Sequence, residues 1–361
     1  MIIRKFVFTL MYCSLLFVCK AENGYELWLR YLPINDKTLI QKYRNNISGV
    51  LIISTSATID IAKRELTTAL NSLLRAQMVT TEKLDRNNLI VAGTPSANSL
   101  IKNAGLEPML NQLDDEGFII VNKIINTKKC IIITGNTDVA VLYGTFHFLR
   151  MIQTGQSLSS LQVVSAPHVK LRMLNHWDNL DRTVERGYAG SSIWNWHTLP
   201  GYIDPRYIDY ARANASIGIN GTVLTNVNAN AVFLTPAYLQ KVSALADVFR
   251  PYGIKVYLTA RFSAPIEIGK LKTADPLDPQ VQEWWKQKIQ EIYREIPDFG
   301  GFLVKANSEG QPGPQDYKRT HTDGANMLAD AIAPYNGIVI WRAFVYSNEN
   351  PVDRHKQAYH D

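Results

Sequence analysis

The second half of the chain alternates short apolar runs with longer amphipathic stretches. Five apolar runs predict buried strands, at residues 169–174, 217–225, 254–259, 302–304 and 338–341. Four stretches between them have apolar positions at helical spacing, at residues 205–215, 236–249, 279–296 and 324–333. Three of these begin with proline in the first turn, which favours a helix start. Strands that are buried on both faces and joined by helices indicate a parallel sheet.

The first half of the chain has a different order of elements. The pattern predicts strands at 25–31, 49–54 and 88–92, a hairpin of 117–121 with 130–134, and helices at 57–76 and 138–151. Thr137 is the predicted N-cap of the last helix. A stretch rich in Ser, Gln and Gly, residues 153–167, resembles a linker. We therefore expect an N-terminal α/β domain with a mixed sheet over residues 22–165.

Polar residues follow every predicted strand of the second half. This repeat favours a (β/α)8 TIM-type barrel over residues 166–361. A doubly wound open sheet is the alternative, and it is disfavoured because no glycine-rich phosphate turn follows the first strand. A complete barrel takes about 250 residues. We therefore expect about five of the eight strands in this chain, which predicts truncation at the C-terminus.

The first 21 residues resemble a secretory signal peptide. Arg4 and Lys5 precede an apolar run over 6–18, and Cys19-Lys20-Ala21 offers small residues at the positions a signal peptidase reads. The run is short for a transmembrane helix. We expect a secreted or periplasmic protein with no membrane association after cleavage. Cleavage would lower the net charge from +6 to +3, which is too small to indicate a nucleic-acid partner.

Cysteine and histidine positions give no cofactor or metal signal. Cys130 is the one cysteine beyond the predicted signal peptide, so no intramolecular disulfide can form there. It lies in an apolar run, which predicts a buried structural thiol. No zinc or calcium ligand spacing occurs, and we expect neither metal nor cofactor.

The strand at 302–304 carries the strongest chemical signal. Lys305, Asn307 and Glu309 alternate after it, so an extended backbone would project them to one side. Glycine and proline at 310–314 then force a loop. A cation and a carboxyl group at the mouth of a strand suit acid chemistry on an anionic substrate. The alternative for this stretch alone is a solvated loop with unrelated charges.

Four motifs together resemble one known family. They are Asn-His-Trp-Asp-Asn at 175–179, Gly-Ile-Asn-Gly-Thr-Val-Leu-Thr-Asn-Val-Asn at 218–228, Val-Lys-Ala-Asn-Ser-Glu-Gly-Gln-Pro-Gly-Pro at 304–314 and Trp-Arg-Ala-Phe-Val-Tyr at 341–346. In this order they are similar to the α-glucuronidases of glycoside hydrolase family 67. The resemblance covers essentially the whole chain beyond the signal peptide.

The resemblance implies a xylan-debranching reaction and a role for each matching residue. Glu309 matches the general acid that protonates the glycosidic oxygen as 4-O-methylglucuronic acid leaves xylose. Lys305 and Arg342 match residues that bind the uronic acid, and a guanidinium can offer its carboxylate two parallel donors. Trp177 matches an aromatic wall of the sugar pocket, and Val227 a contact beside it. The implied partners are glucuronic-acid-substituted xylooligosaccharides, and the full-length family also allows a homodimer.

Several alternatives stay open at this point. The family inverts configuration with a carboxylate base from motifs C-terminal to Arg342, and no counterpart precedes Asp361, so we expect this chain to lack the base and to be inactive or nearly so. A non-catalytic uronate-binding or carbohydrate-binding remnant is the second hypothesis. A β-hexosaminidase-like enzyme ranks lower, because Ser308 stands where an Asp-Glu pair is expected. Trp194 and Trp196 could line a sugar platform or pack beneath their loop.

Overall fold

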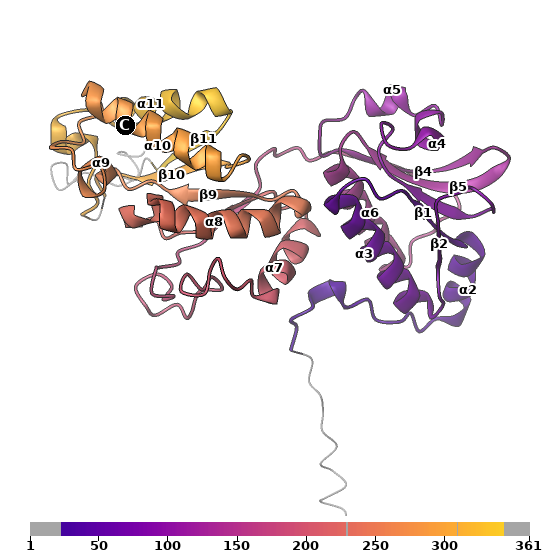
Figure 1. Ribbon diagram of the computed structural model, residues 1–361. Helices are drawn as coiled ribbons and strands as arrows, with labels where there is room; N and C mark the ends of the chain where they lie inside the picture. The colour runs from indigo at the N-terminus through magenta and orange to yellow at the C-terminus, as the bar shows by residue number, and fades with distance from the viewer. Residues whose placement is uncertain (1–22, 229, 309, 343–361) are drawn as a thin grey trace, which may run out of the picture. The chain divides into compact units, whose positions relative to one another are not determined.

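The computed structural model describes residues 23–228, 230–308 and 310–342 (Figure 1). The chain forms two compact units, Met1–Leu32 and Pro33–Asp361. The predicted signal peptide lies outside the described residues. In the first unit the predicted strand at 25–31 is wrong, because Leu27–Arg30 form the 3-10 helix η1. Its hydrogen bonds are local: the N–H of Leu27 donates to the carbonyl of Gly24 at 3.1 Å.

The second unit contains a six-stranded mixed sheet, sheet A, with strand order β2-β1-β3-β5-β4-β6. Its strands are β1 (Gly49–Ile52), β2 (Val79–Thr81), β3 (Leu89–Ala92), β4 (Phe118–Ile125), β5 (Lys128–Gly135) and β6 (Gln162–Ser165). Strands β2, β1, β3 and β5 are parallel, and β4 runs antiparallel to β5 and β6. The predicted mixed sheet and its β4–β5 hairpin are confirmed.

Helices cover both faces of sheet A (Figure 1). They are α2 (Lys37–Asn46), α3 (Ala57–Leu74), α4 (Ser99–Lys102), α5 (Glu107–Leu110) and α6 (Asp138–Gln153). The side chain of Thr137 accepts the N–H of Ala140 at 3.2 Å, which confirms the predicted N-cap of α6. At Gly144 of α6 a Cβ would stand 2.9 Å from Ile133 of β5, so glycine allows the helix to approach the sheet closely.

Sheet B has five parallel strands in sequential order and curls like part of a (β/α)8 barrel. Its strands are β7 (Met173–Asn175), β8 (Gly221–Val223), β9 (Lys255–Thr259), β10 (Gly301–Lys305) and β11 (Ile338–Arg342). The longer helices between them are α7 (Pro205–Ala215), α8 (Pro236–Phe249), α10 (Pro279–Glu295) and α11 (His321–Ile332). Shorter turns complete the connections: η2 (Ala231–Leu234), η3 (Arg250–Tyr252), α9 (Ala264–Glu267), η4 (Pro314–Tyr317) and η5 (Ala333–Tyr335). The predicted parallel sheet is confirmed, and the domain boundary at residue 165 stays a prediction.

Aromatic side chains build the core around sheet B. Trp285 of α10 is fully buried and meets Phe302 of β10 edge to face, with ring centroids 6.0 Å apart. Trp194 and Trp196, in the loop after β7, are 0% and 1% exposed. They therefore pack beneath the loop, and the sugar platform considered for them is wrong. No helix among the described residues is long and apolar enough to cross a membrane.

Candidate functional site

The carboxyl ends of the parallel strands bring two cations together. Lys305 ends β10 and lies in register with Arg342, which ends β11. The Lys305 side chain is buried, and its Nζ donates to Oδ1 of Asn228, in the loop after β8, at 3.0 Å. The guanidinium of Arg342 lies over the ring of Trp177, in the loop after β7, with 5.7 Å between its carbon and the ring centroid. Four strand ends thus contribute to one site.

The floor of this site is apolar. Val227 belongs to a buried cluster with Val223, Tyr257 and Leu303, and Trp177 packs against that cluster. The Val227 side chain is 2% exposed, so it supports the floor more than it faces solvent. Burial raises the pKa of Tyr257 to about 12, so its hydroxyl is neutral at physiological pH. Trp177 is the partly buried member and can present a ring face.

A chain of hydrogen bonds fixes the loop that carries Trp177. His176 Nε2 lies 2.8 Å from the hydroxyl of Tyr210, which lies 2.9 Å from Oγ1 of Thr222 on β8. His176 Nδ1 is 3.7 Å from Oδ1 of the buried Asp178. The hydroxyl of Ser192 also donates to Asp178. Burial raises the pKa of Tyr210, which keeps its hydroxyl neutral and able to donate.

Asn226 connects the loop after β7 with the loop after β8. Its backbone N–H donates to the carbonyl of Asp178 at 2.9 Å, and its Nδ2 donates to the carbonyl of Trp177 at 3.2 Å. Its Oδ1 accepts the N–H of Asn228 at 2.9 Å. Because Asn228 in turn holds Lys305, this amide couples the aromatic wall to the buried ammonium. Asn226 belongs to the Asn-Val-Asn run at the end of the second motif, and no local pattern there predicts this linking role.

Hydrogen bonds join the parts of the loop after β10 that lie on either side of residue 309. Asn307 has a φ of +46°, so the extended alternation expected from Lys305 onward is wrong beyond the strand. Its Nδ2 donates to Asp316 at 3.0 Å, and its Oδ1 accepts the N–H of Gln315 at 2.9 Å. A Cβ on Gly313 would stand 2.1 Å from that oxygen, so only glycine fits. Glu309 itself, the predicted general acid, lies outside the described residues.

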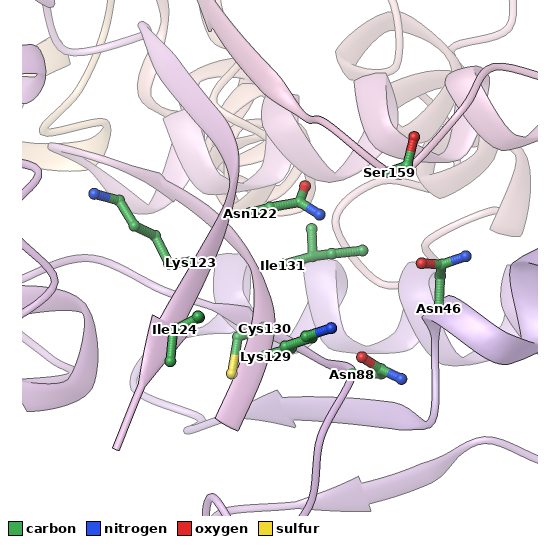
Figure 2. A pocket seen from close by; sticks show the side chains of 9 residues that line it. All are labelled: Asn46, Asn88, Asn122, Lys123, Ile124, Lys129, Cys130, Ile131 and Ser159. Atoms are coloured by element: carbon green, nitrogen blue, oxygen red, sulfur yellow. The ribbon is translucent and has the colours of Figure 1, made fainter. Parts of the chain in front are cut away.

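Sheet A holds a separate cavity of about 640 Å³ at the edge where β3 and β5 begin (Figure 2). Its amides serve the fold: Nδ2 of Asn88 donates to the carbonyl of Asn45 at 2.9 Å, and Nδ2 of Asn122 to that of Leu158 at 3.0 Å. Burial raises the pKa of the Cys130 thiol, which disfavours the thiolate. Cys130 is buried, as predicted. Lys123 and Lys129 also line this cavity, and no acidic residue is among its lining residues in the described structure.

No metal-binding group is visible in the described ranges, where His, Cys, Asp and Glu form no cluster of three able to hold an ion. Two cations, an aromatic ring and an apolar floor can hold an anionic sugar. The roles of the individual site residues stay predictions.

Comparison with known proteins identifies relatives that match most of the chain. Residues 27–148 match the N-terminus of glycosyl hydrolase family 67, and residues 151–361 match the middle domain of that family. A probable alpha-glucuronidase A of Aspergillus fumigatus is 38% identical over 332 residues, 92% of this chain and 39% of the relative. The alpha-glucuronidase A of Emericella nidulans is also 38% identical, over 91% of this chain and 39% of its own length.

The chain therefore spans about two fifths of the length of these relatives. Among solved structures, a family 138 glycoside hydrolase that targets pectin rhamnogalacturonan II matches with a TM-score of 0.51 and 16% identity. That match covers 80% of this chain and 41% of the solved one. At this identity the likeness concerns the fold alone.

Proposed function

The chain belongs to glycosyl hydrolase family 67, and we propose that the strand-end site of sheet B binds the glucuronic acid of a substituted xylooligosaccharide. One observation carries this proposal. Lys305 and Arg342 lie in register on neighbouring strands, and Arg342 lies over the Trp177 ring. Two cations beside one aromatic face match a sugar that bears a carboxylate.

Each group has a distinct task in this proposal. Arg342 offers two parallel N–H donors to the carboxylate, and its position over Trp177 limits the directions in which it can point. Lys305, which is buried and bonded to Asn228, supplies a second positive charge where water screens it little. Trp177 packs against the apolar face of the sugar ring. Val227 keeps that ring in place from below.

The proposed reaction is hydrolysis of the α-1,2 bond to xylose with inversion. Glu309 protonates the glycosidic oxygen as general acid, and a carboxylate on the opposite side activates the attacking water. A secreted or periplasmic location would give the enzyme access to a polysaccharide outside the cell. Binding and turnover are separable steps, and each needs its own measurement.

Calorimetric titration with glucuronate and with neutral xylobiose tests binding. We expect glucuronate to bind more tightly than xylobiose, and Arg342→Gln to weaken glucuronate binding about 30-fold or more, because the substitution leaves the carboxylate without its charged partner. Arg250→Gln is the matched control, since Arg250 pairs with Asp247 and Asp298 away from the strand ends. Equal affinity for the acid and the neutral sugar would refute the proposal.

A second candidate function is uronate binding without turnover. It is supported by the position of Arg342 over Trp177 and beside Lys305, since these three residues could bind a uronate whether or not the chain turns it over. Release of glucuronic acid from an aldouronic oligosaccharide distinguishes the two functions. For a hydrolase we expect Glu309→Gln to abolish release while glucuronate affinity stays unchanged. If the unsubstituted chain binds glucuronate and releases none, the binding function stands instead.

A further inference from the structure

Two neighbouring cavities at sheet A form one groove beside helix α2. The first is the cavity of Figure 2, with a volume of about 640 Å³, and the second has a volume of about 400 Å³. Asn46 and Ser159 line both cavities, so the two adjoin at these residues. Each volume lies within the range of small-molecule sites, about 300–1,000 Å³. We call the two cavities together the α2 groove.

Helix α2 supplies one wall of the α2 groove. Its lining residues recur at helical spacing and so share one face of the helix: Leu39, Lys42, Tyr43 and Asn46. Residues 155–159, between α6 and β6, supply a second wall. The hydroxyl of Tyr43 donates to the carbonyl of Gln156 at 2.8 Å and thereby joins the two walls. The groove is therefore preformed at this point, which lowers the cost of binding a ligand.

The β4–β5 hairpin supplies the third wall. Asn122 lies opposite Ile131, and Ile124 lies opposite Lys129, so these four side chains share one face of the hairpin. Nδ2 of Asn122 donates to the carbonyl of Leu158 at 3.0 Å, which fixes the second wall to the hairpin. Ile124 is 71% exposed. This face therefore offers a ligand an apolar surface beside the ammonium group of Lys129.

The charged side chains that line the α2 groove are all lysines in the described structure. Lys42 lines one cavity, and Lys123 and Lys129 line the other, with no Asp, Glu or Arg in either lining. None of the three lysines forms an ion pair within the described ranges. Lys123 alternates to the other face of β4 from Asn122, so Lys42 and Lys129 are the cations on the groove side. A concave surface with positive charge alone attracts an anion.

Neutral polar groups of the groove suit the hydroxyl groups of a sugar. The Nδ2 atoms of Asn46 and Asn88 donate to backbone carbonyls at 2.8 and 2.9 Å. Their Oδ1 atoms accept no hydrogen bond from the part of the chain that the structure describes, and in Figure 2 these oxygens lie toward Ile131 and Lys129. A saccharide brings hydroxyl donors for both oxygens and an apolar ring face for Ile124.

The lining is less suited to a nucleic acid. Neither cavity has an arginine, the side chain that pairs with phosphate through two parallel bonds. The aromatic ring in the lining is that of Tyr43, which is 2% exposed and so cannot stack on a base. An ammonium group acts as a point charge, which is sufficient to pair with a carboxylate. These features favour an acidic saccharide.

We propose that the α2 groove is a second carbohydrate site, which binds an oligosaccharide bearing uronic acids, a ligand class that rests on the proposed function. Lys42 and Lys129 pair with the carboxylates, and the amide oxygens of Asn46 and Asn88 accept from sugar hydroxyls. Because cations line both cavities, the groove matches carboxylates that are spaced along a chain. A saccharide held at sheet A stays tethered to the protein, which raises its effective concentration at the strand ends of sheet B.

Calorimetric titration of the full chain tests this site with two probes: a xylooligosaccharide that bears two glucuronic acids, and the unsubstituted xylooligosaccharide of the same length. Arg342→Gln, which weakens the strand-end site of sheet B, is the starting protein. We expect it to bind the acidic probe more tightly than the neutral one. Adding Lys42→Gln and Lys129→Gln should weaken binding of the acidic probe about fivefold or more, because two pairs with carboxylates are lost.

The matched control removes the same charge elsewhere. Lys83→Gln and Lys102→Gln replace two exposed lysines outside both cavities, and together they should leave the affinity for the acidic probe unchanged. If both pairs of lysine substitutions weaken binding equally, the attraction is a general effect of charge and the α2 groove is not a site. If neither pair weakens binding, the proposal is also wrong.

The outcomes separate the α2 groove from the strand-end site. Binding of the acidic probe that is lost in Arg342→Gln alone overturns the groove and leaves the proposed function intact. Binding that is kept in Arg342→Gln and weakened by Lys42→Gln with Lys129→Gln supports the groove, even if glucuronate fails to bind at the strand ends. If the unsubstituted chain does not bind the acidic probe, the proposal is wrong.

A second readout needs no lysine variant. In the Arg342→Gln protein, the backbone amide NMR signals of Asn46, Lys129 and Ser159 should shift when the acidic probe is added, because these residues line the groove. The signals of Lys83 and Lys102 should not shift. Unchanged signals of the three groove residues at a saturating concentration of the acidic probe would contradict the proposal.

Discussion

Arg212 of α7 and Glu65 of α3 form a two-contact ion pair between helices that flank different sheets. Arg212 Nε donates to Oε1 at 2.6 Å, and Nη2 donates to Oε2 at 2.9 Å. The Glu65 side chain is 5% exposed and that of Arg212 is 24% exposed. If one member of the pair is removed, little water can reach the charge of the other member and solvate it. We predict that Arg212→Met destabilises the Pro33–Asp361 unit strongly.

The magnitude follows from this burial. Removing one partner of a buried ion pair costs about 3–5 kcal/mol, because the remaining charge stays in a medium of low polarity. Water can reach part of Arg212, so we expect the low end, about 3 kcal/mol, for Arg212→Met. Replacing both members, with Glu65→Leu added, removes the stranded carboxylate. The double variant should lie within about 1 kcal/mol of the unsubstituted protein.

Urea unfolding followed by circular dichroism measures the free energy of unfolding of the three proteins. Arg206→Met is the matched control on the same helix, because Arg206 pairs with Asp204 at 2.7 Å while 52% exposed, and such a surface pair contributes less than about 1 kcal/mol. If Arg212→Met costs no more than Arg206→Met, the pair is solvated and the reasoning fails. If the double variant is as unstable as the single one, packing and not charge is responsible.

Three further predictions concern other parts of the chain. Stability should fall as the pH drops below about 6.5, because the folded state lowers the pKa of His147 and the unfolded chain binds the proton more readily; His147→Gln should flatten this slope in thermal melts between about pH 5 and 8. Trp285→Ala should cost about 3–5 kcal/mol in urea unfolding because Trp285 is fully buried, and Trp284→Ala, at a partly exposed position, should cost less. Gly313→Ala should weaken glucuronate binding in calorimetry but lower the melting temperature only slightly. The added Cβ would displace Asn307 and so disturb the loop after β10 more than the core of the fold.

The helices of sheet B were predictable because their start signals are local. The bounds predicted for α7 and α8, Pro205–Ala215 and Pro236–Phe249, match the structure. A proline in the first turn has a fixed φ and lacks the N–H that would otherwise be unpaired, so it marks a helix start in the sequence itself. In α7 the side chain of Asp204 also accepts the N–H of Arg206, as an N-cap should.

The strands were less predictable, because their lengths depend on distant partners. The strand expected at 169–174 is only Met173–Asn175. Nη1 of Arg172 donates to the carbonyl of Val169 at 2.6 Å, so this carbonyl bonds a side chain and not a neighbouring strand. Val169 is also 64% exposed in spite of its apolar side chain. Strand β6 falls inside the stretch expected to be a linker, because its polar composition hides an edge strand that pairs with β4.

The residues of the candidate site also differ in how far the sequence predicts them. Lys305 and Arg342 could be predicted, because each directly follows an apolar run and parallel strands end at a common edge. The role of Tyr210 could not be predicted, because its hydrogen bond to His176 joins residues that are 34 positions apart. No local sequence pattern around either residue indicates this pairing. The spacing of apolar positions along the sequence indicates whether a segment is a helix or a strand. Side-chain hydrogen bonds between elements produce no such regular spacing.

The pairing of Lys305 with Arg342 also bears on the proposal that this edge of sheet B binds a ligand. Like charges on directly opposed strand positions are unfavourable, and here one of them is buried. The fold tolerates them because Asn228 accepts from Lys305 and the Trp177 ring lies under Arg342. Neither Asn228 nor Trp177 carries a negative charge, so each of them orients its cation without forming an ion pair with it. An arrangement that costs stability in this way is typical of binding sites, which agrees with the proposal that this edge binds an anionic sugar.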